Sequence, residues 1–311
     1  MASHPTEPLK AEKFLRAAIE YIEPMRGTHI HQAICRDYME KTGRTDSSYG
    51  SWLSKVLPYL SSRYRLLGKR VLDFGCGTGE LTVRMRTLGY EAYGLDLHEK
   101  HLSLAGILAA ENDVPPEAFI LNKGAGAPHP KLPFPDQSFD IVTLFSVLEH
   151  LSDANLRTLL PELRRVCRGI IYVLVPNRLK PVDDHTGLQF ICWFPRCVAV
   201  PYVRLRGFAR GYHISVDATW DVYNRTFRRI KSILRPFGFR IDFIPDDFIF
   251  PPLQDALTRL TRRVSILGKT VTLSLPTPWN RLLNWGSPPQ ALYPYLNMAW
   301  VPRRSDQEAR E

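Results

Sequence analysis

A glycine-rich turn with an acidic residue downstream is the strongest chemical signal in this 311-residue sequence. The turn, Gly75-Cys76-Gly77-Thr78-Gly79, contains glycines that permit the left-handed backbone angles with which a chain approaches a ligand closely. It follows an apolar run, residues 71–74, that suits a buried parallel strand, and it precedes residues with helical spacing. A second short run ends on Asp96, whose carboxylate can accept hydrogen bonds from both hydroxyls of a ribose. This order of elements is the layout of a nucleoside-binding unit.

The positions of the glycines indicate which nucleoside is bound. A dinucleotide fingerprint requires a third glycine at the sixth position of G-x-G-x-x-G, and Glu80 stands there. The run VLDFGCGTG instead resembles motif I of the class I S-adenosylmethionine-dependent methyltransferases, whose turn holds a methionine moiety and a ribose. The resemblance implies S-adenosyl-L-methionine as cofactor, and a structural turn of another α/β protein is the alternative. We assign to the cofactor site Asp73, Gly75, Cys76, Gly77, Gly79, Asp96, Leu97 and Phe145.

A second run, LPFPDQSFDIV, is similar to the type 11 branch of this class, which includes ubiquinone and menaquinone C-methyltransferases. In that branch an acidic side chain just before the run often contacts the adenine amino group. Here Lys123-Gly124-Ala125-Gly126 has no acid, so either backbone groups recognise adenine or the loop is shifted. The resemblance covers roughly residues 68–188 well.

Two histidines and one glutamate follow the expected strands at positions suited to acid–base chemistry. Methyl transfer from a sulfonium needs the acceptor held in line, and it needs a base only where the acceptor loses a proton. Histidine suits that role near neutral pH. We assign Glu149 and His150, after the fourth strand, and His185, after the fifth, to the catalytic site. Two alternatives stay open: Glu149 and His150 bonding loop backbone beside the cofactor, and His185 as an exposed loop residue.

A metal is the rival use of these side chains. Some O-methyltransferases of this fold, including small-RNA 2′-O-methyltransferases, bind Mg²⁺ through E-x-x-E-H and a later histidine. The first position of that pattern is Ser146 here. One carboxylate with one or two imidazoles offers too few oxygen ligands for a hard cation, so we expect no metal.

The alternation of strand and helix signals predicts an α/β fold of the Rossmann-like, doubly wound type. We expect a seven-stranded, mostly parallel sheet with helices on both faces and the ligand crevice at the carboxyl ends of the strands. The expected strands cover residues 71–74, 91–95, 118–122, 141–145, 170–175, 239–244 and 296–301. The expected helices cover residues 11–22, 30–41, 52–64, 80–88, 97–111 and 219–234, the last with Arg225 on its outer face. A further helix is expected to be capped by Ser152, bent or split at Pro161 and ended by Gly169.

Domain boundaries follow from these elements. We expect an N-terminal helical cap at residues 1–66, a methyltransferase domain at 67–304 and a disordered tail at 305–311. Within the domain, residues 177–218 are expected to form a lid over the active site. Residues 245–294 are an insertion between the last two strands, which the family usually joins by a hairpin.

Charge, cysteine content and hydropathy indicate the partners and the compartment to be expected for this chain. The formal net charge of +10 favours acidic partners, although scattered surface arginine would also explain it. Five cysteines without a C-x-x-C pair argue against a disulfide framework or zinc cluster and favour a reducing compartment. The polar amino terminus has no secretory pattern, and no apolar run approaches the ~20 residues of a membrane span, so we expect a cytoplasmic protein. The oligomeric state is not fixed by the sequence.

These features predict a methyltransferase acting at O or C of a small, hydrophobic acceptor. Residues 189–210 mix aromatic and apolar side chains with arginines, which suits either a lid lining the acceptor pocket or peripheral contact with an anionic membrane. We do not expect nucleic acid as partner. Phe145-Ser146-Val147-Leu148 replaces the [Asn/Asp]-Pro-Pro-aromatic motif of base-amino methylation, and the Pro-Cys nucleophile of pyrimidine chemistry is missing. A non-catalytic scaffold is the third alternative, against which the glycines and Asp96 argue.

Overall fold

The computed structural model describes residues 7–23, 42, 44, 47–66, 68, 70–123, 131–206, 222–245, 265–266, 269–270, 289–292 and 295–302. The expected helix at residues 30–41 and the expected tail at 305–311 lie outside the described residues. So do most of the expected insertion and residues 207–218 of the expected lid.

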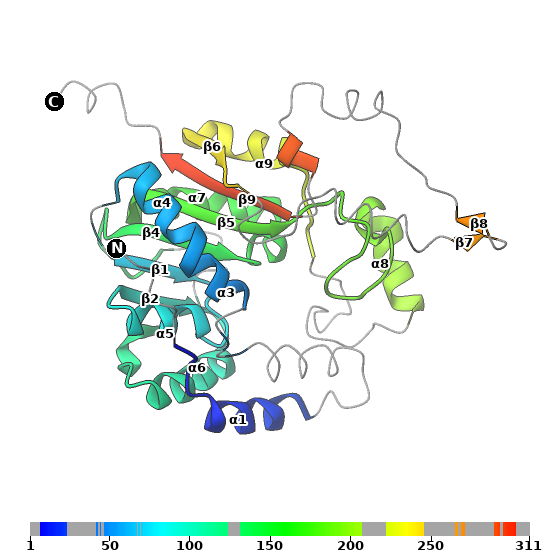
Figure 1. Cartoon of the computed structure of the whole chain (residues 1–311). Helices are drawn as coiled ribbons and strands as arrows, with labels where there is room; N and C mark the ends of the chain where they lie inside the picture. Colours follow the sequence, from blue (N-terminus) through cyan, green and yellow to red (C-terminus); the bar gives the residue numbers. More distant parts are fainter. Residues whose placement is uncertain are drawn as a thin grey trace, which may run out of the picture.

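A seven-stranded sheet forms the centre of the molecule, in the order β3-β2-β1-β4-β5-β9-β6 (Figure 1). Strands β1 to β5 run parallel, and β9 is antiparallel to both of its neighbours. The predicted fold class is therefore confirmed. The strands are β1 Arg70–Phe74, β2 Glu91–Asp96, β3 Phe119–Leu121, β4 Phe139–Phe145, β5 Cys167–Pro176, β6 Phe239–Phe243 and β9 Tyr295–Pro302.

The register of the central strands gathers their carboxyl ends at one edge. Phe74 of β1 lies opposite Leu95 of β2, and Asp73 of β1 lies opposite Thr143 of β4. Strand order reverses between β1 and β4, which is the point where ligands bind in open α/β sheets. The glycine turn, Asp96 and the residues after β4 all follow at this edge.

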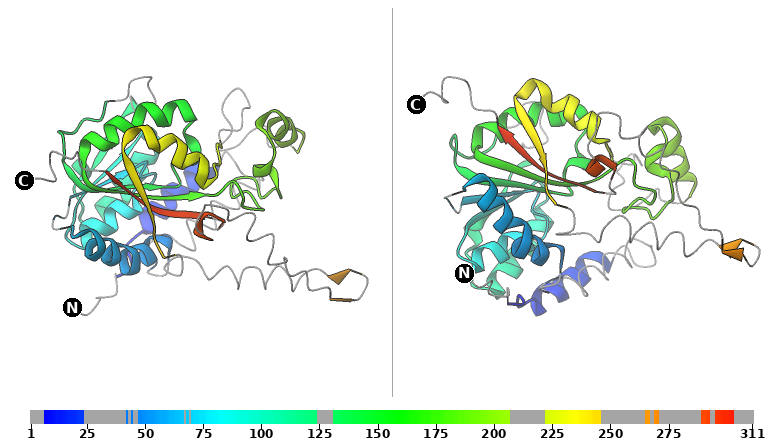
Figure 2. Two further views of the ribbon diagram at one scale, coloured as in Figure 1. Left: turned by 90° about the horizontal axis from the view of Figure 1, so that it is seen from above. Right: turned by 45° about the horizontal axis from the view of Figure 1, so that its top comes forward.

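Helices cover both faces of the sheet (Figure 2). One face is covered by α3 Ser48–Ser51, the π-helical turn η2 Trp52–Val56, α4 Leu57–Tyr64 and α5 Glu80–Thr87; the other by α7 Asp153–Val166 and α9 Phe227–Leu234. Ile141 and Val142, adjacent in β4, enter the hydrophobic clusters on opposite faces. Burial on both faces explains why the parallel strands are continuously apolar.

The first helix is attached to the sheet indirectly, through a neighbouring helix. Helix α6, Glu99–Glu111, packs beside α5, and α1, Glu12–Ile22, packs on α6. The Glu111 carboxylate accepts hydrogen bonds from Lys13 N at 2.8 Å and Phe14 N at 2.9 Å. An acidic side chain at a helix amino terminus satisfies free N–H groups and complements the helix dipole. This contact fixes the start of α1.

The prediction for the helix before β5 was partly wrong. Ser152 does cap α7, since its side chain accepts from Asn155 N at 3.1 Å. However, α7 continues through Pro161 as one helix and ends at Val166, and Gly169 lies inside β5. A Cβ on Gly169 would lie 2.1 Å from Asp140 O. This glycine therefore permits close approach of two strands and does not end a helix.

The helix expected at residues 219–234 begins later than predicted. Thr226 caps α9 by accepting a hydrogen bond from Arg229 N at 3.3 Å, and the first helical residue is Phe227. Residues 219–221 lie outside the described part of the chain. Arg225 therefore precedes the helix, and it is buried, contrary to the predicted outward orientation.

Two segments extend beyond the sheet. After β5, the turn η6 Ile191–Trp193 and helix α8 Arg196–Leu205 form a small cluster of their own around Ile191, Ala199 and Val203 (Figure 1). Between β6 and β9, a two-stranded ribbon, β7 Ser265–Ile266 and β8 Lys269–Thr270, and the turn η9 Pro289–Leu292 are described. The remaining short turns are η3 Pro116–Ala118, η5 Leu148–His150 and η7 Arg235–Phe237. In the described part of the chain, every helix is too short or too polar to span a bilayer.

Candidate active site

The glycine turn after β1 lies across the end of the neighbouring strand. Gly75 N and Cys76 N both donate to Leu95 O, at 2.7 and 3.1 Å. Gly75, Gly77 and Gly79 have φ angles of 75°, 53° and 80°, in the region that favours glycine. A Cβ on Gly77 would meet no atom within 4 Å, so the backbone here borders open space. A ligand could approach this part of the turn closely.

Asp96, at the end of β2, is held against the turn. Its carboxylate accepts from Gly77 N at 2.9 Å and from His98 N at 2.8 Å, and His101 Nδ1 lies 3.8 Å away. Burial by itself would raise the Asp96 pKa, but the nearby His101 imidazole and the hydrogen bonds from His98 N and Gly77 N outweigh it and lower that pKa. The group is therefore an ionised acceptor at neutral pH, fixed in orientation by backbone.

Asp73 lies beneath the turn. Its two oxygens accept from Thr82 Oγ1 of α5 at 3.0 Å and from Thr143 Oγ1 of β4 at 2.9 Å. Burial raises the Asp73 pKa to about 6 despite these hydrogen bonds. The carboxyl group thus connects three elements that surround the turn.

The loop after β4 approaches the glycine turn closely. A Cβ on Gly75 would lie 2.5 Å from Val147 Cγ2, so only glycine leaves room for this contact. Ser146 has a φ of 51° and donates its N–H to Leu174 O at 2.9 Å. A left-handed backbone at a residue other than glycine costs about 1–3 kcal/mol and persists only where neighbours enforce it. Val147, the residue before the turn η5, thereby lies next to the glycine turn.

Glu149 is fully buried in the turn η5. Its backbone carbonyl accepts from Tyr223 N at 2.6 Å. Burial raises the Glu149 pKa to about 8. The charge of Arg225 and a hydrogen bond from the Ser146 side chain act against this rise but do not cancel it, so the carboxyl group is mainly protonated at neutral pH.

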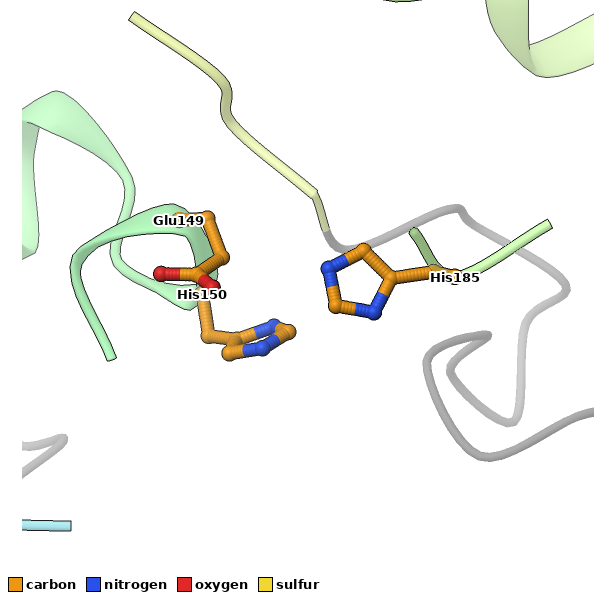
Figure 3. A group of neighbouring side chains, drawn as sticks. All are labelled: Glu149, His150 and His185. Atoms are coloured by element: carbon orange, nitrogen blue, oxygen red, sulfur yellow. The ribbon is translucent and has the colours of Figure 1, made fainter. Parts of the chain in front are cut away.

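His150 and His185 meet beside Glu149 (Figure 3). Their ring centroids are 5.2 Å apart, with the planes inclined at 66°. One ligand atom from each of Glu149, His150 and His185 lies within 4.8 Å of the other two. Burial lowers the His185 pKa, which favours the neutral imidazole. The three side chains assigned to catalysis from the sequence are therefore neighbours, able to accept a proton or to bind a cation.

The loop that carries His185 is fixed by its neighbours in sequence. The buried Asp183 carboxylate accepts from Thr186 N and Thr186 Oγ1, both at 2.8 Å. Gly187 N donates to Asp183 O at 2.9 Å. These bonds close a tight turn around His185 and position its ring toward His150.

Arg225 holds the turn that carries Glu149 and His150, and sequence reasoning missed it. Its guanidinium donates to Leu148 O at 2.8 Å and to Leu151 O, and its Nε donates to Asp153 Oδ1 at 2.6 Å. This buried arginine therefore satisfies two carbonyls of the turn at once. No signal in the sequence separates Arg225 from the other arginines around it.

A second missed group contacts Asp184, the residue before His185 in the sequence. Tyr295, at the start of β9, donates its hydroxyl to Asp184 Oδ2 at 2.8 Å. Lys180 Nζ donates to both Asp184 and the Tyr295 oxygen. Burial and the Asp184 carboxylate raise the Tyr295 pKa. This network ties the loop after β5 to the last strand.

The remaining predicted residues have varied surroundings. Cys76 is buried, and burial raises the pKa of its thiol. Leu97 is 43% exposed beside Asp96. The Phe145 ring packs on Trp52 and Tyr172, at centroid distances of 5.6 and 5.2 Å. Residues 124–126, the expected adenine loop, lie outside the described residues.

Helix α8 and the loop before it present apolar side chains to solvent. Phe190, Trp193 and Phe194 are 44%, 50% and 44% exposed, and Leu205 is 83% exposed. Arg204 and Arg206 are exposed on the same segment. Phe190 and Trp193 lie together, with ring centroids 4.8 Å apart.

The strand order and the glycine turn with its acid define the fold of the class I S-adenosylmethionine-dependent methyltransferases. Residues 72–172 match a family described as a methyltransferase domain. This domain belongs to that family, in the type 11 branch of the class.

Known proteins of this kind resemble part of the chain. The ubiquinone biosynthesis O-methyltransferase of Paraburkholderia phymatum is 36% identical over 99 residues, which cover 32% of this chain and 40% of that protein. The protein of the same name from Pseudomonas fluorescens is 36% identical over 97 residues, 31% of this chain and 40% of that protein. The chain thus spans about two fifths of the length of these curated relatives. A solved methyltransferase from Archaeoglobus fulgidus has 19% identity, a TM-score of 0.42 and coverage of 82% of this chain and 94% of its own.

Proposed function

We propose that this protein transfers a methyl group from S-adenosylmethionine to oxygen or carbon of a small, hydrophobic acceptor. The observation that carries the proposal is the arrangement at one edge of the sheet. There Gly77 N orients the Asp96 carboxylate, Val147 after β4 lies against Gly75, and His150 and His185 lie together after β4 and β5.

The residues at the turn fit the cofactor. An ionised carboxylate offers about four lone-pair positions, and backbone N–H groups of Gly77 and His98 occupy two of those on Asp96. The others suit the two ribose hydroxyls. Gly77 leaves space for the methionine moiety, Leu97 offers an apolar side chain for the adenine ring, and Asp73 holds the turn from below.

When bound, S-adenosylmethionine supplies a methyl group on a sulfonium that already contains its leaving group. The protein must then align the acceptor and accept a proton where one is lost. His150 and His185 suit the second task, because imidazole titrates near neutral pH and burial favours neutral His185. The relatives' name, O-methyltransferase, together with these bases makes a hydroxyl the favoured acceptor group.

The acceptor is proposed to approach from the segment after β5. Its exposed apolar side chains, Phe190, Trp193 and Phe194, would contact a hydrophobic acceptor. The same side chains with Arg204 and Arg206 suit peripheral contact with an anionic membrane, from which such an acceptor could be taken.

The histidine assignment is tested by His150→Ala and His185→Ala. With a phenolic acceptor, we expect turnover to fall by about 100-fold or more, because a positioned base contributes about that much. Affinity for S-adenosylmethionine, measured by calorimetry, should change little. Unchanged turnover in both variants would remove the histidines from the reaction.

A further inference from the structure

A pocket with a volume of about 590 Å³ is lined by four segments that are separate in the sequence. They are the first turn of α7, the loop after β5, the residues from η6 to the start of α8, and the residues that lead into α9. Pockets of about 300–1,000 Å³ commonly hold small-molecule ligands. We call it the arginine pocket, because its charged lining is Arg178, Arg196, Arg225, Arg229 and Asp153.

The charges that line the arginine pocket are not balanced. Asp153 Oδ1 accepts from Arg225 Nε at 2.6 Å, and Asp153 Oδ2 accepts from Arg229 Nε at 2.8 Å. Arg178 donates instead to two backbone carbonyls before α8, at 3.1 and 3.4 Å, and no acid bonds to it among the described residues. A carbonyl satisfies a donor without neutralising its charge, so the pocket has an excess of positive charge.

A second pocket, near the start of β5, also contains arginines but differs in this respect. Arg165 lies 2.8 Å from Asp136 Oδ1, and Arg168 lies 2.8 Å from Asp140 Oδ1. Both acids line that pocket together with their arginines. The two arginines are therefore paired with acids, whereas the arginine pocket has one acid for four arginines.

Contacts hold the guanidinium groups of the arginine pocket in place. Arg196 donates to Val222 O at 2.7 Å, and its guanidinium carbon lies 4.1 Å from the centroid of the Tyr223 ring. The two carbonyl bonds hold Arg178. Helix α9 starts at the pocket, where its cap residue Thr226 forms part of the lining, and a helix amino terminus adds partial positive charge. Donors that are already positioned bind an anion without the cost of ordering side chains.

We propose that the arginine pocket binds a phosphate group, carried by a soluble phosphate ester or by a lipid headgroup. A phosphate monoester has a charge of about −1.5 to −2 at pH 7 and three acceptor oxygens, so several guanidinium groups can donate to it at once. A carboxylate, with a single charge and two oxygens, would leave more of the positive charge uncompensated. Phe194 and Val222 add apolar lining that suits an organic substituent.

The arginine pocket adjoins the turn η5 but is separate from the proposed cofactor site. Tyr223, which lines it, donates its N–H to Glu149 O at 2.6 Å, and Arg225 donates to Leu148 O at 2.8 Å. Among the described residues, its lining includes neither the glycine turn nor Asp96. Phosphate binding here therefore goes beyond methyl transfer and can be measured without it.

Calorimetry with inorganic phosphate and phenyl phosphate tests the soluble source. Co-sedimentation with phosphatidylcholine vesicles, with and without phosphatidic acid, tests the headgroup. We expect saturable binding in at least one arm, and Arg178→Gln and Arg229→Gln should each weaken it by about 5-fold or more, because each removes a charged donor. Arg63→Gln, which removes the same charge from an exposed residue of α4 outside the pocket, should change affinity little.

The outcomes identify the source and separate this site from the proposed reaction. Binding of phenyl phosphate in solution indicates a soluble ester, and binding confined to vesicles with phosphatidic acid indicates a headgroup. No binding in either arm, equal affinity in the parent and both pocket variants, or an equal loss in Arg63→Gln would overturn the proposal. Phosphate binding without affinity for S-adenosylmethionine would contradict the proposed function and support this site.

Thermal unfolding checks that each variant keeps its fold. If Arg178→Gln unfolds, Arg229→Gln still decides the test, because Arg229 is exposed and Asp153 keeps its bond to Arg225 in that variant.

Discussion

At the scale of single residues, two acids of the proposed cofactor site have opposite electrostatic environments. Asp96 is stabilised as an anion by backbone N–H groups and His101, which lower its pKa. Asp73 lies deeper, where burial raises its pKa to about 6 although two threonines donate to it. An anion at Asp96 is required for hydrogen bonds from ribose, whereas Asp73 can be neutral and still organise the turn.

Asp73 should make stability depend on pH. Its pKa rises from 3.8 to about 6 on folding, so its contribution is complete below pH 3.8 and is lost as pH rises through about 6. Asp73→Asn keeps an acceptor for one threonine and a donor for the other, and removes the titration. We expect the stability of the variant relative to the parent to increase between pH 4 and 6 and then level off, measured by urea unfolding.

The comparison of the two proteins isolates Asp73, because Glu149, with a pKa of about 8, is present in both. A stability difference that stays constant from pH 4 to 7 would show that Asp73 does not titrate in this way.

At the scale of elements, some structural features could be predicted from the sequence and others could not. The strand–turn–helix around VLDFGCGTG, the Ser152 cap and the positions of β6 and β9 depend on local pattern, and they were predicted. Gly169 was misjudged because its role depends on the approach of Asp140, a distant residue. Arg225 and Tyr295 reach the site from segments far along the chain, so only the fold places them there.

A prediction at this scale concerns binding of the segment around α8 to an anionic membrane. If Trp193 and Phe194 enter a membrane interface, Trp193→Ser with Phe194→Ser should reduce binding to vesicles that contain phosphatidylglycerol several-fold, and added salt should reduce it further. Leu88→Ser, which changes an exposed apolar residue at the end of α5, is the matched control. Co-sedimentation measures the bound fraction. Equal binding of both variants and the parent would rule out this surface.

At the scale of the whole molecule, the open sheet brings distant segments together at one edge. The glycine turn after β1, the acid that ends β2, the turn after β4 and the loop after β5 all lie at carboxyl ends of parallel strands. Strand alternation predicted this convergence. The contact between His150 and His185 required the fold, since thirty-odd residues and a complete helix and strand separate them.

Calorimetric titration with S-adenosylmethionine and S-adenosylhomocysteine tests the central claim most directly. We expect micromolar binding of both, and at least about 10-fold weaker binding by Asp96→Ala, which loses charged hydrogen bonds to the ribose. Thermal unfolding of the variant checks that its fold is kept. Failure of the parent to bind either compound, or equal affinity in Asp96→Ala, would contradict the assignment of this site to the cofactor.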